Sequence, residues 1–224
     1  MKTISIVTPV FNAEKFIAET IESVISQKGN FSIEYIIVDG ASTDSTARIC
    51  EQYIDIVNKD FRYKNVKIKL MSESDKGMYD ALSKGLCIVT GDIVAYLNAS
   101  DFYLPNAFSV VEKIFSSRKD VYWLTGINSF ANSSGHIVTN FLPYKYHRSW
   151  VRKYVYGGQL MHIQQESTFW RAGLLEDIDY FKLANMNMAG DFYLWHSFSL
   201  RYSLEIVHAQ LGCFRQHEEH KSSN

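Results

Sequence analysis

The sequence predicts an α/β protein built on a mostly parallel sheet flanked by helices. Strand-like and helix-like segments alternate through the first 120 of its 224 residues. Repeated strand–helix units place successive strands parallel, with right-handed crossovers. Hydrophobic residues make up 46% of the chain, which is ample for the core of one largish domain. We therefore expect one domain over residues 1–224, with a regular half up to residue 120 and an irregular half from residue 121.

The first two strand–helix units begin with apolar runs. Residues 4–11 (ISIVTPVF) and 35–39 (YIIVD) are β-rich and nearly continuous, as buried parallel strands are. Asn12 is a candidate cap for the first helix, which ends at Gly29. Helical periodicity places one set of its residues on a single inward face, namely Phe16, Ile17, Thr20, Ile21, Val24 and Ile25. The second helix starts at Asp44 or Ser45 and turns inward Cys50, Tyr53, Ile54 and Val57.

Two further units complete the regular half. Residues 66–71 alternate in polarity, which predicts a strand nearer the edge of the sheet. A helix from about residue 78 to Gly91 follows, and then a strand over 92–98 and a helix over 106–117. From residue 121 the sequence pattern is different: it predicts short strands (121–127 and 136–142) and contains many aromatic residues and a basic patch.

Charge and cysteine usage exclude several classes of protein. A net charge of −1 leaves no global field that would recruit nucleic acid. Three scattered cysteines (Cys50, Cys87 and Cys213) indicate a reducing compartment rather than a disulfide framework. The opening MKTISIVTPVFN reads as a first strand and not as a signal peptide, and no window approaches the roughly 18 apolar residues of a membrane span. We expect a soluble, cytoplasmic protein.

Carboxylates follow three of the predicted strands. Asp39, Asp75 and Asp101 stand in the connections after residues 35–39, 66–71 and 92–98. In open α/β sheets ligands sit beyond the carboxyl ends of the strands, so we expect the three to meet at one rim. Such a group would be neutralised by a hard cation, Mg²⁺ or Mn²⁺. Asp is also common in turns and helix caps, and that simpler role is favoured for any one of them taken alone.

Phosphate-binding glycine loops are missing from the sequence. There is no G-x-G-x-x-G after the first strand and no G-x-x-x-x-G-K-[ST] anywhere. A divalent ion held by a carboxylate is the other route to a diphosphate.

Six segments occur in an order that resembles the family 2 glycosyltransferases, in particular bacterial members that build surface polysaccharides. They are VTPVFNAEKFIAETIESVISQ, YIIVDGASTDST, SDKGMYDALSKGLCIVTGDIVAYLNASD, QESTFWRAGL, GDFYLW and GCFRQHEEHKS. The likeness covers nearly the whole chain, from Ile4 to Lys221. The resemblance implies a GT-A fold, a nucleotide-diphosphate sugar donor, Mg²⁺ or Mn²⁺, and inverting transfer. It also implies a nucleotide-sugar-binding half over residues 1–120 and an acceptor and catalytic half over residues 121–224.

The resemblance assigns the donor side residue by residue. Four residues of the first strand-to-helix turn would face the nucleoside: Thr8, Pro9, Phe11 and Asn12. Asp39 would bond to the base or ribose, with Asp75 and Lys76 beside the nucleotide. LNASD matches the family's acidic pair and makes Asp101 the metal ligand. Ser100 departs from the usual second aspartate, although its hydroxyl could hold a metal-bound water or a ribose hydroxyl.

The resemblance also assigns the acceptor side, where each role has a plainer alternative. Asp191 in AGDFYLW would be the catalytic base, or only the N-cap of a helix. Gln165 and Glu166 would line the donor-sugar and acceptor pocket, although Glu166 could simply pair with Arg171. Arg215 and His217 would approach the diphosphate, or belong to a solvated tail. The spacing of His217 and His220 does not match the H-E-x-x-H zinc signature.

A basic, aromatic stretch over residues 144–156 raises the question of a membrane. Residues 121–165 contain no Asp or Glu, and Lys145, Arg148 and Arg152 share one face if the stretch is helical. Such a surface can lie peripherally on anionic lipid at the inner face of the membrane, which suits a lipid-linked acceptor. It could equally bind the negative donor or be an ordinary solvated face.

Three functions compete. The first is an inverting, metal-dependent transferase acting from a UDP-linked sugar on a saccharide or lipid-linked saccharide. The second, motivated by Ser100, is a degenerate module that binds sugar nucleotides or a partner without turnover. The third is a nucleotidyltransferase, which ranks last because TPVFNAEKF lacks the glycine- and arginine-rich loop of that class.

Overall fold

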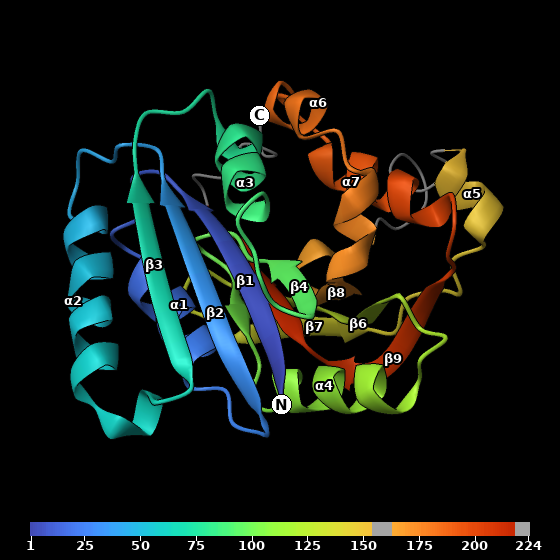
Figure 1. The fold of residues 1–224 in the computed structure, drawn as a ribbon, viewed down its shortest axis with the longest axis horizontal. Coiled ribbons are helices and arrows are strands. Elements are labelled where there is room, and N and C mark those ends of the chain that lie inside the picture. Colours follow the sequence, from blue (N-terminus) through green and yellow to red (C-terminus); the bar gives the residue numbers. More distant parts are fainter. Residues whose placement is uncertain (154–162, 218–224) are drawn as a thin grey trace.

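Among the described residues, four parallel strands form one part of a ten-stranded sheet (Figure 1). The computed structural model describes residues 1–153 and 163–217. Strands β1 (Lys2–Val10), β2 (Phe31–Asp39), β3 (Val66–Ser72) and β4 (Ile93–Tyr96) lie in the order β3-β2-β1-β4, and each neighbouring pair is parallel. The alternating strand β3 lies at the edge, as predicted. All four strands therefore end at the same rim of the sheet.

Three of the predicted helices connect these strands, α1 (Ile17–Ile25), α2 (Thr46–Lys59) and α3 (Met78–Leu86), and the fourth, α4 (Ala107–Ser117), comes after them in the chain. Helix α1 buries the face expected from its periodicity. Its N-cap position is Phe16 and not Asn12, so the predicted cap is wrong. Asn12 instead adopts a left-handed backbone (φ 49°), and its side chain accepts a bond from the amide of Thr43. A short 3₁₀ turn, η1 (Phe61–Tyr63), precedes β3.

The second half of the sheet is arranged around the long strand β6 (Trp123–Ala131). Strands β7 (Ile137–Phe141) and β8 (Thr168–Arg171) pair with it antiparallel, and β9 (Leu204–Gln210) and β10 (Gly212–Arg215) pair with it parallel. The short strand β5 (Phe102–Tyr103) pairs with β10. Strand β8 also pairs with β4, so one continuous sheet passes through both halves of the chain.

Short helices lie around this second half: α5 (Arg148–Arg152), η2 (Gln165–Ser167), η3 (Ala172–Asp177), α6 (Tyr180–Ala184) and α7 (Gly190–Ser199). Figure 1 shows α3, α6 and α7 gathered near the end of the sheet where β2 and β3 terminate. No helix in residues 1–153 or 163–217 is long and apolar enough to cross a bilayer.

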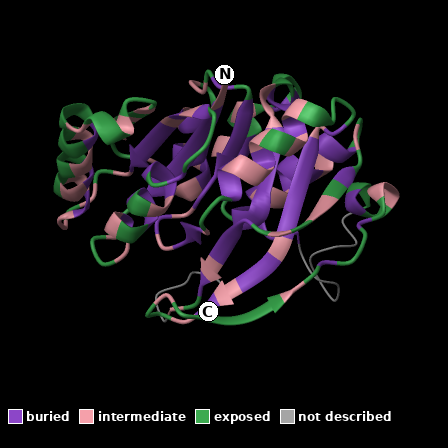
Figure 2. Cartoon of the chain, turned by 90° about the horizontal axis from the view of Figure 1, so that it is seen from below, coloured by how far each residue is buried: buried purple, intermediate pink, exposed green. Residues whose placement is uncertain are grey.

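An aromatic cluster anchors α7 to the sheet. Trp195 and Phe198 of α7 pack on Trp123 of β6 and Trp170 of β8, with ring centroids 5.4–5.8 Å apart. Such pairs contribute about 0.5–1.5 kcal/mol each beyond their burial. Buried residues follow the strands, whereas the outer sides of the helices are exposed (Figure 2). Helix α7 is thereby fixed relative to β6 and β8.

Candidate functional site

The loops after β1 and β2 are bonded to each other at the rim. The amide of Asn12 donates to Ser42 Oγ (2.8 Å), and the amide of Thr43 donates to Asn12 Oδ1 (2.8 Å). Phe11 and Asn12 are exposed, with 61% of Phe11 open to solvent. Thr8 and Pro9 are instead buried in β1, where Thr8 Oγ1 lies 3.0 Å from the hydroxyl of Tyr35. Of the four residues predicted to face the nucleoside, the structure presents two to solvent.

Asp39 and Asp75 come together at the ends of β2 and β3. The buried carboxylate of Asp39 accepts bonds from the amide and hydroxyl of Ser42 and from Ser72 Oγ (2.7 Å). A Cβ at Gly40 would stand 2.6 Å from Asp75 Oδ2, so only glycine allows this approach. Lys76 is exposed, and its amide donates to Asp80 Oδ2 (3.0 Å).

Asp101 lies apart from those two, beside Glu166. It is fully buried, and its Oδ1 accepts a bond from the amide of Arg215 (2.9 Å). Glu166, 4% exposed, is hydrogen-bonded to Asp101. Burial, followed by the charge of Asp101, raises the pKa of Glu166 well above its ordinary value. The pair therefore favours a protonated Glu166 when nothing else neutralises the two carboxyl groups.

The expectation that Asp39, Asp75 and Asp101 surround one cation is wrong. Among the described residues, no three His, Cys, Asp or Glu side chains gather closely enough to hold a metal. Asp39 is occupied by Ser42 and Ser72, and Asp101 has Glu166 as its neighbour. Asp101 and Glu166 supply hard oxygen ligands of the kind that Mg²⁺ and Mn²⁺ take, and both ions commonly complete their shells with water and substrate phosphate. These residues fit such a cation if the donor supplies further ligands.

Asp191 lies in the first turn of α7, next to Tyr79 of α3. The N-cap position of the helix is Ala189, so the alternative role of Asp191 as an N-cap is not found. The hydroxyl of Tyr79 donates to Asp191 Oδ1 at 3.4 Å. Burial, and then the charge of Asp191, raise the pKa of Tyr79 to about 12. A Cβ at Gly190 would stand 2.4 Å from the Tyr79 ring, which shows how closely α3 and α7 approach.

Sequence reasoning missed Tyr79. The available signal was its place in the first turn of the helix that follows the loop of Asp75, directly behind the rim. A tyrosine on an otherwise apolar helix face is usually read as core, and Tyr79 is indeed only 8% exposed.

Buried Tyr96, at the end of β4, is influenced by the charges of all three carboxylates, Asp101, Glu166 and Asp191. Its pKa is raised by burial and then by the charges of Asp191, Tyr79, Glu166 and Asp101. Gln165 fixes the end of this strand, because its Nε2 donates to the carbonyl of Tyr96 and its Oε1 accepts from Asn98 (3.3 Å). The metal-ligand candidate and the base candidate thus lie in one electrostatic neighbourhood.

The suggested pairing of Glu166 with Arg171 is not found. The guanidinium of Arg171 donates to the carbonyls of Val121 (2.8 Å) and Phe115 (2.9 Å), at the far end of β8.

Arg215 is the last residue of β10, and His217 follows two residues later. The guanidinium of Arg215 is buried and donates to the carbonyl of Ser100 (2.7 Å) and to Glu19 Oε2 (2.5 Å). The His217 ring lies 4.8 Å from the Phe16 ring, centroid to centroid. Residues 218–221 of the closing motif lie outside the described residues.

Residues 5–170 match the sequence profile of a family described as "Glycosyl transferase family 2". The chain belongs to glycosyl transferase family 2. The minor teichoic acid biosynthesis protein GgaA of Bacillus subtilis is 31% identical over 121 residues, which are 52% of this chain and 26% of GgaA. An uncharacterized glycosyltransferase of Mycobacterium tuberculosis is 26% identical over 212 residues, which are 94% of this chain and 72% of that protein.

The fold of this family 2 chain is also that of S. aureus TarS. A crystal structure of TarS 1–349 in complex with UDP-GlcNAc superposes with a TM-score of 0.72 at 17% identity. The match covers 100% of this chain and 61% of the TarS chain, and the same TarS fragment has been solved with UDP. The expected GT-A-like fold and the resemblance to bacterial surface-polysaccharide transferases are confirmed.

The basic stretch of this family member differs from the expectation. Helix α5 spans only Arg148–Arg152, so Lys145 is not on its face. Arg148 donates to the carbonyls of Ser199 (2.7 Å) and Leu200 (2.6 Å), where it caps the end of α7. Lys145, Arg152 and Lys153 are exposed, as are Tyr144 and Trp150. Residues 154–156 of the stretch lie outside the described residues.

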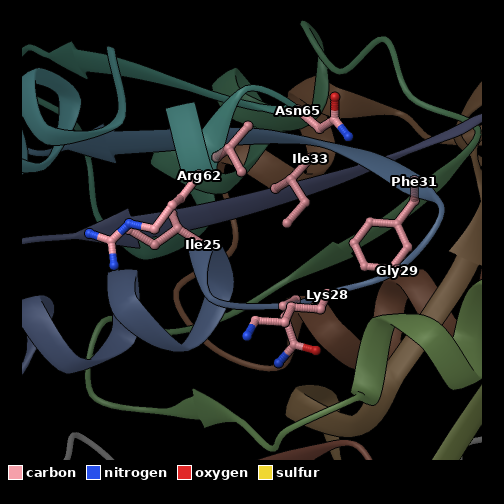
Figure 3. A pocket seen from close by; sticks show the side chains of 9 residues that line it. Ile25, Lys28, Gly29, Phe31, Ile33, Arg62 and Asn65 are labelled. Carbon is pink, nitrogen blue, oxygen red and sulfur yellow. The ribbon is translucent and has the colours of Figure 1, made fainter. Parts of the chain in front are cut away.

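A pocket of about 410 Å³ lies at the opposite end of the sheet, where β2 and β3 begin (Figure 3). Its lining includes Lys28, Phe31, Ile33, Arg62 and Asn65. None of the predicted site residues lines it. In an open α/β sheet the ligand side is the carboxyl end of the strands, so the rim, and not this pocket, is the candidate functional site.

Proposed function

We propose that the chain is an inverting, metal-dependent glycosyltransferase. It moves a sugar from a UDP-linked donor to a saccharide or lipid-linked saccharide acceptor during polysaccharide biosynthesis. The observation that carries this proposal is that Asp101 is hydrogen-bonded to Glu166, and that the charges of both and of Asp191 act on buried Tyr96 at the end of β4. UDP and UDP-GlcNAc complexes of TarS, and the teichoic acid role of GgaA, support the nucleotide and the class of pathway.

On the donor side, Asp101 is the metal ligand and Glu166 its buried neighbour. A bound Mg²⁺ or Mn²⁺ stabilises the negative charge of the leaving diphosphate. Phe11 and Asn12 present the first loop to the nucleoside, with Thr8 and Pro9 supporting them from within β1. Asp39 holds the adjoining loop that contacts the base or ribose, and Asp75, Lys76 and Ser100 border the nucleotide. Gln165 and His217 complete the pocket.

On the acceptor side, Asp191 is the general base. Inverting transfer is a single displacement: the acceptor oxygen bonds to the anomeric carbon as the bond from that carbon to the diphosphate oxygen breaks. The proton of the acceptor hydroxyl passes to Asp191. Tyr79 donates to the same carboxylate and orients it. A lipid-linked acceptor would bring the protein to the cytoplasmic face of the membrane, where the exposed Lys145, Arg152 and Lys153 contact anionic headgroups.

A thermal-shift panel tests the donor site. UDP, GDP, dTDP and CDP are compared with and without Mn²⁺, on the unaltered chain and on Asp101→Ala. We expect UDP to stabilise the chain only with Mn²⁺, and Asp101→Ala to abolish that shift. No shift with any diphosphate would contradict the proposal.

The base assignment has its own test. Asp191→Asn should lower kcat by about 10²- to 10⁴-fold while UDP binding is retained, because only proton transfer is lost. Normal turnover by this variant would refute the role of Asp191.

Ser100, in place of a second aspartate, favours one alternative: a module that binds sugar nucleotides without transferring them. Release of UDP from UDP-sugars in the presence of an acceptor distinguishes the two. Mn²⁺-dependent binding with no release across a broad acceptor panel would support the alternative.

A further inference from the structure

Arg215 bonds to three other segments of the chain from a buried position. Its guanidinium donates through Nε to the carbonyl of Ser100 (2.7 Å), through Nη1 to the carbonyl of Ser133 (3.2 Å) and through Nη2 to Glu19 Oε2 (2.5 Å). Its own amide donates to Asp101 Oδ1 (2.9 Å). One residue of β10 therefore bonds to α1, to the turn between β6 and β7, and to both Ser100 and Asp101.

The surroundings hold this guanidinium rigidly. The side chain of Arg215 is 2% exposed, and its Cζ lies 5.3 Å and 5.0 Å from the ring centroids of Phe16 and Phe102. At Gly135, where φ is +80°, a Cβ would stand 3.1 Å from both Arg215 Nη1 and Glu19 Oε1. A buried cation is strongly destabilising unless it is paired and hydrogen-bonded, so Glu19 is the partner that keeps Arg215 in place.

We propose that Arg215 is a positioning residue for Asp101, anchored by Glu19, and not a ligand of the diphosphate. It binds the carbonyl of Ser100 and one carboxylate oxygen of Asp101 at the same time, which sets the orientation of the Asp101 carboxylate. Glu19 acts through Arg215 although it belongs to α1, and its side chain is about half exposed at 52%. This inference rests on the proposed role of Asp101 in holding a cation and diphosphate.

Titration calorimetry with two probes tests the inference on the full chain. The first probe is UDP with Mn²⁺, or the diphosphate of the panel that stabilises the chain most. Its affinity depends on the proposed cation and diphosphate site at Asp101. The matching nucleoside, uridine for UDP, reports on the nucleoside loop alone. Arg215→Lys keeps the charge and loses the planar fork. We expect it to weaken binding of Mn²⁺–UDP by about tenfold, as the loss of a residue that orients a metal ligand does. Uridine affinity should stay within about twofold.

Glu19→Gln separates positioning from direct contact. Removing this anchor should weaken the binding of Mn²⁺–UDP by about threefold. The double variant, Glu19→Gln with Arg215→Lys, should bind no more weakly than Arg215→Lys alone, because both changes act on one contact. Arg171→Lys is the matched control: its guanidinium also bonds carbonyls and packs on a phenylalanine ring, 5.0 Å away, but at the far end of β8. It should leave both affinities unchanged.

Several outcomes would overturn the inference. The inference is wrong if Arg215→Lys binds Mn²⁺–UDP as tightly as the unaltered chain. It is also wrong if Arg215→Lys binds Mn²⁺–UDP more weakly while Glu19→Gln keeps full affinity. The latter pattern identifies a direct diphosphate contact. If Arg215→Lys does not fold, the affinity of Glu19→Gln for Mn²⁺–UDP still tests the inference, because Glu19 is half exposed. Failure of the unaltered chain to bind any nucleoside diphosphate with Mn²⁺ would instead remove the proposed function, and this inference with it.

Discussion

Glu166 is buried at 4% exposure beside the carboxylate of Asp101, and its pKa is raised by that burial and then by Asp101. In the pH range between its ordinary and its raised pKa, the folded chain holds a proton that the unfolded chain has lost. Stability from this group is therefore present at low pH and is lost as the pH rises through that range. Ionising a buried carboxyl group costs about 1.4 kcal/mol for each unit by which its pKa is raised.

Glu166→Gln removes the ionisation and keeps the shape. We expect its free energy of unfolding to exceed that of the unaltered chain by about 1 kcal/mol or more at pH 8, and by less at pH 5. If the proposed cation binds at Asp101, activity should also fall, because that cation would lose the neighbouring carboxylate. Urea unfolding of both chains at the two pH values measures the difference. A difference that does not change with pH would show that Glu166 is already ionised in the folded chain.

Tyr79 bonds the proposed base at 3.4 Å, and its hydroxyl can be removed without disturbing the ring packed on Gly190. We expect Tyr79→Phe to lower kcat by about tenfold, as for the loss of one hydrogen bond to a charged group, with KM nearly unchanged. Tyr180→Phe is the control, because its hydroxyl makes an equally long 3.4 Å bond to the carbonyl of Leu175 instead. Equal effects of the two changes would argue against an orienting role.

At the scale of elements, the site depends on the approach of α7 to α3. A methyl group at Gly190 would stand 2.4 Å from the Tyr79 ring, whereas at Gly173 it would meet nothing within 4 Å. We expect Gly190→Ala to lower the free energy of unfolding by about 1–3 kcal/mol through overpacking, and to reduce kcat by displacing Asp191. Gly173→Ala should change neither quantity. Thermal unfolding and steady-state kinetics check both, and an active, fully stable Gly190→Ala would contradict this account.

Local patterns predicted the regular half of the fold well. The apolar runs of β1, β2 and β4 and the amphipathic faces of α1 and α2 each depend on neighbours in sequence, and so does the alternation that placed β3 at the edge. The Asn12 cap failed because the side chain bonds across to Thr43 in another loop. Competition of that kind depends on tertiary contacts and leaves no periodic signal.

For the whole molecule, the rim was predictable and its pairings were not. Strand ends and acidic turns indicated where Asp39, Asp75 and Asp101 would lie. The partners that define the site join distant positions: Asp101 with Glu166, Tyr79 with Asp191, and Glu19 with Arg215. They depend on β8 and β10 returning to β4 and β6, and no short-range pattern encodes those antiparallel and parallel pairings. The family resemblance supplied candidate residues but not these contacts.

The outer surface of the molecule leads to one more prediction, on contact with a membrane. Lys145, Arg152 and Lys153 are exposed beside Tyr144 and Trp150, whereas Arg148 is held by the end of α7. Each basic residue near an anionic surface contributes about 1 kcal/mol, so Lys145→Gln with Lys153→Gln should lower vesicle binding by about 10- to 30-fold.

Co-sedimentation with vesicles of phosphatidylcholine containing phosphatidylglycerol measures this, at low and high salt. The control replaces Lys59 and Lys64, two exposed lysines on the α2 side of the molecule, with glutamine. One outcome is vesicle binding that falls at high salt and on replacing Lys145 and Lys153, but not on replacing Lys59 and Lys64. That result would place the acceptor side against lipid, because α5 contacts α7 and α7 carries Asp191. Equal binding by both pairs, or none by the unaltered chain, would leave these cations as a solvated face and direct the search for the acceptor to soluble saccharides.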